Sequence, residues 1–201
     1  MALTIYGTHR SRTMRVLWTA AELGRSYEHV PLAVDDPWLK SPAFLAISPN
    51  GTVPAIVDDG FALAESLAIN LYLTKRYALG SLYPATLEGE ADAWRWTLWA
   101  QGQLEPWVMR DARLAALRAA SASAAQAEID RALALLDRTL AGREWLLGDS
   151  FGVGDLNVAG VLSPSRASRL DLAPYPALGA WLARCYARPA AVETRQRFAT
   201  P

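Results

Sequence analysis

The sequence predicts an α/β domain of order β-α-β, β-β-α followed by an all-α domain. The first 80 residues alternate strand-like and helix-like segments, whereas the chain beyond residue 88 has the apolar spacing of helices throughout. The stretch "ALGSLYPATLE", residues 78–88, contains the glycine and proline breaks typical of a linker. We therefore expect domains at 1–80 and 88–201.

The α/β half begins with a β-α-β unit. Residues 3–6, "LTIY", form a short strand, and residues 27–34 can form a second one. Between them, about 12–23 has an apolar helical face, and Gly24 is placed to end that helix. The apolar face consists of Met14, Leu17, Trp18 and Ala21. Such a unit predicts a parallel strand pair with a right-handed crossover.

A hairpin and a second helix complete this half. Residues 53–57 and 61–63 are short strand segments, separated by Asp58-Asp59-Gly60, which is a hairpin signal. Residues 65–77 then show helical spacing. The hairpin adds an antiparallel strand to the parallel pair.

The second half is expected to be helical. Helices are predicted at 91–117, 124–140, 153–162 and 177–187. Tryptophans at helical spacing in the first of these are usually core residues rather than a ligand site. They are Trp94, Trp96, Trp99 and Trp107.

The segment "GVGD", residues 152–155, precedes one of these helices. Gly152 cannot supply the side-chain half of a capping box, but Asp155 can reach back to the N–H of the cap residue. We interpret this site as structural.

Composition narrows the class of protein. Acidic and basic residues number 20 each in 201 residues, so no overall charge favours nucleic acid or an anionic membrane. No apolar run approaches the ~20 residues that span a bilayer, and no signal peptide is recognisable. Cys185 is the single cysteine, which fits a reducing compartment, and the two histidines lack metal-ligand spacing. We expect a cytoplasmic protein without a metal.

Four stretches in order resemble the cytosolic glutathione transferases, over essentially the whole chain. They are "SRTMRVLW", "SPNGTVPAIVDDG", "LAESLAINLYL" and "YPALGAWLARCYARP". The first is most similar to serine-type bacterial and fungal members. The resemblance implies a thioredoxin-like glutathione domain, a helical domain that contributes the electrophile site, glutathione as co-substrate, and a homodimer.

Pro54 stands directly before the strand-like triplet "AIV". A trans proline that opens a strand is the ordinary interpretation. In the family, the matching proline is cis and turns the preceding residue, here Val53, toward glutathione. The N–H and C=O of Val53 would then pair with the cysteinyl backbone of the tripeptide, and we predict a cis Val53–Pro54 bond.

The reaction requires a thiolate, and Ser11 is the candidate residue to stabilise it. A free thiol titrates near ~8.5, and one hydrogen bond to a charged group, about 1.5–3 kcal/mol, supplies most of the shift needed at neutral pH. Ser11 lies four residues before Arg15, the family spacing of the catalytic serine. Its ordinary alternative is a helix cap. Tyr6, Thr8 and Thr13 are rival hydroxyls.

Glutathione binding is assigned to two further stretches. Ser66 and its N–H would bind the γ-glutamyl carboxylate at a helix N-terminus, with Glu65 facing the amino group. Thr52 stands where many members have a lysine, so the partner of the glycyl carboxylate stays open. The candidates are His9, Arg10, Arg12 and Lys40.

For the electrophile pocket we select Trp107, Arg110 and Arg113. The predicted reaction is conjugation of glutathione to small hydrophobic electrophiles. The alternatives are another glutathione-dependent enzyme on this fold, such as a dehalogenase, isomerase or peroxidase, or a non-catalytic binding or scaffold protein.

Overall fold

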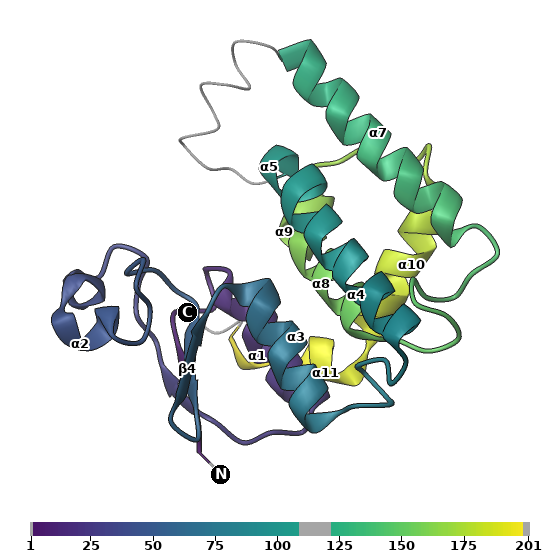
Figure 1. The fold of residues 1–201 in the computed structure, drawn as a ribbon. Coiled ribbons are helices and arrows are strands. Elements are labelled where there is room, and N and C mark those ends of the chain that lie inside the picture. The colour runs from purple at the N-terminus through teal and green to yellow at the C-terminus, as the bar shows by residue number, and fades with distance from the viewer. Residues whose placement is uncertain (1, 109–121, 199–201) are drawn as a thin grey trace. The chain divides into compact units, whose positions relative to one another are not determined.

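A computed structural model describes residues 2–108 and 122–198 of the chain. The chain divides into two compact units, one made of Met1–Tyr83 with Arg188–Pro201 and the other of Pro84–Ala187 (Figure 1). The predicted range 88–201 for the second domain differs from this division, because the segment from Arg188 onward packs with the first unit.

The first unit contains a four-stranded mixed sheet of order β2-β1-β3-β4. Its strands are β1 (Leu3–Tyr6), β2 (Glu28–Val30), β3 (Ala55–Asp58) and β4 (Phe61–Ala64). As predicted, β1 is parallel to β2, and β3 with β4 forms an antiparallel hairpin. The strand predicted from residue 53 begins only at Ala55, because Pro54 has no N–H for a ladder hydrogen bond.

Each face of the sheet is covered by helices. Helices α1 (Thr13–Glu22) and α3 (Ser66–Tyr77) bury one face. That core contains Leu3, Ile5, Val16, Leu17, Ile56, Ile69 and Leu73. The short helices η1 (Pro37–Lys40) and α2 (Pro42–Leu45) cover the other face, with a core of Leu39, Phe44 and Ala55.

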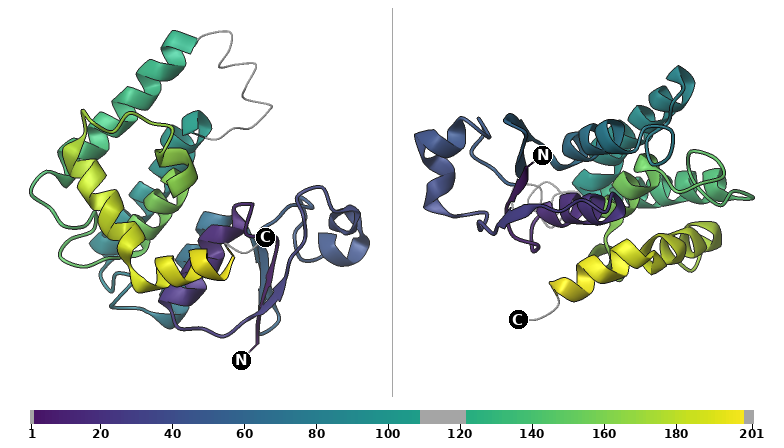
Figure 2. Two further views of the ribbon diagram at one scale, coloured as in Figure 1. Left: turned by 180° about the vertical axis from the view of Figure 1, so that it is seen from behind. Right: turned by 90° about the horizontal axis from the view of Figure 1, so that it is seen from below.

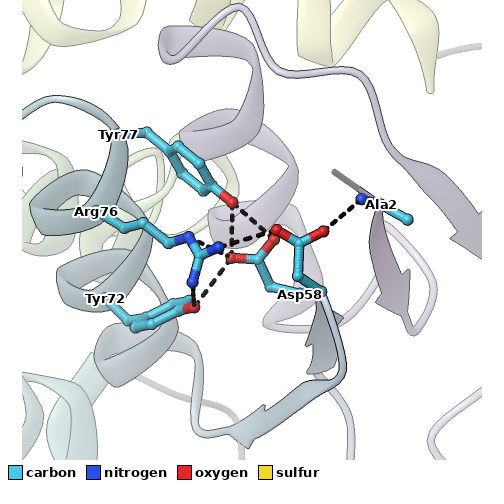
Figure 3. Close-up of polar contacts among 6 residues, drawn as sticks. Ala2, Asp58, Tyr72, Arg76 and Tyr77 are labelled. Carbon is cyan, nitrogen blue, oxygen red and sulfur yellow. Dashed lines mark hydrogen bonds and ion pairs between the residues drawn. The ribbon is translucent and has the colours of Figure 1, made fainter.

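A buried carboxylate ties the end of α3 to the sheet (Figure 3). Asp58, the last residue of β3, is fully buried and accepts hydrogen bonds from the hydroxyls of Tyr72 (3.0 Å) and Tyr77 (2.8 Å). The Arg76 guanidinium lies 3.3 Å from the same carboxylate. Burial, followed by the hydrogen bond to Asp58, raises the pKa of Tyr77. This cluster fixes the C-terminal end of α3 against the sheet. Because α3 is a single helix, it also helps to fix the position of Ser66 at the N-terminus of α3.

Helix α11 (Pro189–Arg197) lies along α1 (Figure 2). Arg188, just before it, donates two hydrogen bonds to the Glu22 carboxylate at the end of α1, at 2.8 and 2.7 Å. The sequence patterns above did not predict this helix.

The second unit is helical. Its helices are α4 (Leu87–Trp99), η2 (Ala100–Leu104, a π-helical stretch), α5 (Glu105–Val108), α7 (Ala122–Leu140), α8 (Val153–Leu162), α9 (Pro164–Ala167) and α10 (Pro176–Ala187). Every residue of α8 is buried, and α4 and α10 pack against it.

The tryptophans of α4 do not form one core stripe. Trp96 is 1% exposed, whereas Trp94 is 51% exposed. Residues two apart cannot share a helix face, so the core interpretation was wrong for Trp94. The part of the predicted helix over 91–117 that follows Val108 lies outside the described residues.

Asp155 closes the N-terminus of α8, as predicted. It is fully buried and accepts hydrogen bonds from the N–H of Gly152 (3.1 Å), the N–H of Leu146 (2.8 Å) and the Trp181 indole (2.7 Å). Burial raises the pKa of Asp155, and these hydrogen bonds oppose the rise. Across residues 2–108 and 122–198, none of the helices combines the length and apolar character needed to traverse a bilayer.

Candidate functional site

The Ser11 loop, residues 7–12, connects β1 to α1. Its first residue, Gly7, has φ 121°, and a Cβ there would lie 2.1 Å from Thr13 Oγ1 and 2.8 Å from Val53 Cβ. Glycine is therefore required for the close approach of this loop to α1 and Val53. The N–H groups of Gly7 and Thr8 donate to carbonyls of Val30 (2.8 Å) and Leu32 (2.9 Å), which anchors the loop beside β2.

Ser11 is half-buried, and its hydroxyl has three local contacts. It donates to the Thr8 carbonyl (2.8 Å), accepts the N–H of Thr13 (3.1 Å) and lies 2.8 Å from Thr13 Oγ1. The cap interpretation is thus partly realised, since Ser11 accepts the N–H of the first helical residue. Thr13 is fully buried and can donate its hydroxyl proton to Ser11 Oγ. Ser11 can then donate to an acceptor outside the loop in place of the Thr8 carbonyl.

Tyr6 lies on the other face of the sheet. Its ring packs at 6.2 Å from Trp38 and 5.9 Å from Phe44, in the core beneath α2. This placement fits the interpretation of Tyr6 as a wall residue.

The loop before β3 presents an unpaired backbone edge. The Val53–Pro54 bond is cis, as predicted. Ser48 holds the preceding residue, because its hydroxyl donates to the Thr52 carbonyl at 2.9 Å. Among the described residues, the N–H and C=O of half-buried Val53 have no hydrogen-bond partner. Val53 therefore offers one donor and one acceptor beside the Ser11 loop.

Lys40 reaches this same loop from η1. Its ammonium donates to the Gly51 carbonyl at 3.1 Å, next to exposed Thr52. Of the four side chains considered for the glycyl carboxylate, His9 instead stacks on Phe198, at 5.2 Å. Many members of the family have a lysine at the position of Thr52. Here the ammonium group of Lys40 lies next to that position instead.

The N-terminus of α3 is not capped by the residue before it. Glu65 is exposed with φ 73°, and its side chain makes no capping hydrogen bond. Ser66 is 4% exposed and accepts a 3.2 Å hydrogen bond from the guanidinium of Arg15, itself 3% exposed. The N-terminal end of a helix, with its partial positive charge, and a buried guanidinium together favour a carboxylate at this point.

The contact of Arg15 with Ser66 was missed by the sequence analysis, which used Arg15 only for spacing. No local pattern could have indicated it, because Arg15 and Ser66 lie 51 positions apart in the chain. The contacts of Lys40 with Gly51 and of Ser11 with Thr13 depend on how the loops fold. No sequence pattern predicts such contacts.

The predicted electrophile pocket is only partly within the described residues. Trp107 is half-buried in α5. Arg110 and Arg113 lie outside the described residues, so their role stays a prediction.

Comparison with known proteins gives the family. Residues 10–76 match the glutathione S-transferase N-terminal domain, and residues 102–189 match the C-terminal domain. Glutathione S-transferase GstB of Escherichia coli K12 is 32% identical over 198 residues, covering 94% of this chain and 95% of GstB. Disulfide-bond oxidoreductase YfcG of the same organism is 34% identical over 160 residues, 74% of each chain.

Solved structures agree on the fold. A glutathione transferase family member from Pseudomonas fluorescens, with two glutathione bound, matches with a TM-score of 0.80 and 24% identity, over 96% of this chain and 92% of its own. With both domain models matched in order and relatives of this identity, the chain belongs to the glutathione S-transferase family.

Proposed function

We propose that the first unit binds glutathione and that the protein conjugates the glutathione thiolate to small hydrophobic electrophiles. The observation that carries this proposal is the close approach of Gly7 to Val53. It sets the hydroxyl-bearing Ser11 loop beside Val53, whose backbone N–H and C=O have no hydrogen-bond partner among residues 2–108 and 122–198. A tripeptide paired with Val53 would thus hold its cysteinyl sulfur near that loop.

The remaining groups fit the two ends of the tripeptide. Ser66 and the N–H groups of α3 would bind the γ-glutamyl carboxylate, and exposed Glu65 would face its amino group. Lys40, which already donates to the Gly51 carbonyl, would bind the glycyl carboxylate across Thr52. Each of the three charged groups at the two ends of the tripeptide would then face an opposite charge or a helix N-terminus.

Ser11 would act by donating to the thiolate. Its hydroxyl turns from the Thr8 carbonyl to the sulfur, and Thr13 donates to Ser11 Oγ in its turn. Lowering the thiol pKa by ~2 units corresponds to ~2.7 kcal/mol, within reach of one hydrogen bond to a charged acceptor at about 1.5–3 kcal/mol.

The similarity to YfcG supports a second candidate, a glutathione-dependent disulfide reductase. Such a reaction would rely on glutathione thiols alone at this site, because the only cysteine of the sequence, Cys185, is buried in α10. We further expect a cytoplasmic protein and a homodimer. Light scattering at micromolar concentration, with glutathione present, would test the homodimer.

Calorimetry with glutathione, followed by rate measurements, tests the proposal. We expect glutathione binding and conjugation of a generic aromatic electrophile such as a chlorodinitrobenzene. Binding with disulfide reduction but no conjugation would favour the second candidate. Binding without either reaction would favour a scaffold protein, and no binding would refute a glutathione site altogether.

A further inference from the structure

Helix α11 is fastened to the rest of the first unit at both ends. At the first end, Arg188 pairs with Glu22, whose side chain is only 4% exposed. Glu22 also accepts a 2.8 Å hydrogen bond from the Trp18 indole, so the pair is built into α1. An ion pair this enclosed fixes where α11 starts.

At the other end, Phe198 packs between the two histidines of the chain. Its ring stacks on His9 at 5.2 Å with 14° between the planes, and meets His29 edge-on at 5.4 Å and 77°. Phe198 also packs against the core shared by the sheet and α1. One ring thus joins the Ser11 loop, through His9, to β2, through His29.

Both histidines belong to the support of Ser11. His29 Nε2 lies 2.8 Å from the carbonyl oxygen of Gly7, the first residue of the loop. His9 directly follows Thr8, whose carbonyl also accepts the backbone N–H of Ser11, at 3.1 Å. Movement of His9 would therefore shift the backbone of Ser11 and, with it, the position from which the Ser11 hydroxyl donates.

We propose that Phe198 is a positioning residue for Ser11. By clamping His9 against His29, it holds the loop in the conformation from which Ser11 donates to the glutathione thiolate. This inference rests on the function proposed above. The groups assigned to the two ends of glutathione, Ser66 and Lys40, lie on other elements, so the clamp should affect ionisation of the thiol rather than affinity for the tripeptide.

Phe198→Leu is the test, because leucine retains apolar contact with the core but removes both ring pairs. An aromatic pair corresponds to about two- to tenfold in an equilibrium constant. We expect the thiol pKa in the glutathione complex to rise by about half to one unit, and the neutral-pH conjugation rate to fall about three- to tenfold. Glutathione affinity measured below that pKa should stay within twofold. Phe198→Tyr should restore the titration.

Phe61→Leu is the matched control. It also removes a ring pair from the first unit, the contact of Phe61 with Tyr72 at 5.0 Å. Phe61 pairs with Asp58 at the end of the sheet opposite Tyr6, and so lies away from the Ser11 loop. We expect this variant to leave the titration unchanged.

Amide hydrogen exchange of residues 7–12, without glutathione, separates this inference from the proposed function. Phe198→Leu should speed exchange there, and Phe61→Leu should not. Unchanged exchange in Phe198→Leu would refute the clamp, whether or not the wild-type protein binds glutathione. A failure of the wild-type protein to bind glutathione would, by itself, refute only the proposed function. An unchanged titration, or no rescue by Phe198→Tyr, would also overturn the clamp.

Discussion

Two helix N-termini of this chain, those of α8 and α3, satisfy their N–H groups in opposite ways. At α8, fully buried Asp155 accepts from the N–H of Gly152 and from two further N–H groups. At α3, the exposed side chain of Glu65 makes no capping hydrogen bond, and buried Arg15 contacts Ser66. Both termini have the same partial positive charge.

The difference separates a structural terminus from one able to bind a ligand. At α8, the chain itself supplies a buried carboxylate, which also holds together parts of the second unit through Leu146 and Trp181. At α3, the neighbouring carboxylate, that of Glu65, is exposed and does not cap the helix. Our proposal assigns that place to the γ-glutamyl carboxylate. The predictions below test this contrast, beginning with the largest expected effect.

Asp155→Ala should destabilise the protein most. It leaves three buried N–H donors unpaired and removes the cap of α8, so we expect a loss of about 3 kcal/mol or more in the free energy of unfolding. Urea unfolding followed by circular dichroism measures it. A loss under about 1 kcal/mol would mean that α8 does not depend on its internal carboxylate.

Asp155→Asn is the control for charge. Its amide would place a donor against an N–H, so we expect a smaller loss, of about 1–3 kcal/mol. Because burial raises the pKa of Asp155, the Asp155 carboxyl group binds its proton more tightly in the folded wild type than in the unfolded chain. The contribution of Asp155 to stability therefore declines as pH rises from the unfolded value near ~3.9 through the higher folded pKa, and the asparagine variant should lack this decline.

Ser11→Ala should have the next largest effect, on the reaction rather than on folding. Losing about 1.5–3 kcal/mol of thiolate stabilisation raises the thiol pKa by ~1–2 units and lowers the neutral-pH rate roughly ten- to a hundredfold. Affinity for glutathione at low pH should hardly change, because the neutral thiol gains little from this donor. Thiolate absorbance against pH measures the shift.

Tyr6→Phe is the companion variant and should have little effect on either quantity. If the thiol of bound glutathione titrates in Ser11→Ala as it does in the wild type, Ser11 is only a helix cap. The activating donor would then be Thr8, Thr13 or a backbone N–H of the loop.

Those parts of the fold and of the candidate site that depend on local patterns could be predicted from the sequence. The hairpin signal predicted the β3–β4 pair, and the spacing of Gly152 and Asp155 predicted the α8 cap. By contrast, the segment after Arg188 is a largely polar helix with a weak apolar face. It is held by partners such as Glu22, 166 positions away in the chain, and no local pattern reports such a contact.

Ser66→Ala tests the α3 terminus directly. It removes a hydroxyl that would bind the γ-glutamyl carboxylate and that contacts Arg15. We expect glutathione affinity to weaken about tenfold, the lower end of the range for a hydrogen bond to a charged group, with the thiol pKa in the complex unchanged. Ser81→Ala, at an exposed serine of the same unit, is the matched control. Equal affinity for all three proteins would show that α3 does not bind the carboxylate.

Lys40→Ala should have the smallest effect. Lys40 is exposed, so its attraction to the glycyl carboxylate is screened by solvent and worth about 0.2–1 kcal/mol, or up to about fivefold in affinity. The effect should shrink as salt is raised from 0.05 to 0.5 M, roughly the range over which the Debye length falls from about 14 to 4 Å. Lys75→Ala, on α3, is a control of the same charge. Glutathione lacking its glycine should bind wild type and Lys40→Ala equally well, and a difference between them would place Lys40 elsewhere in the site.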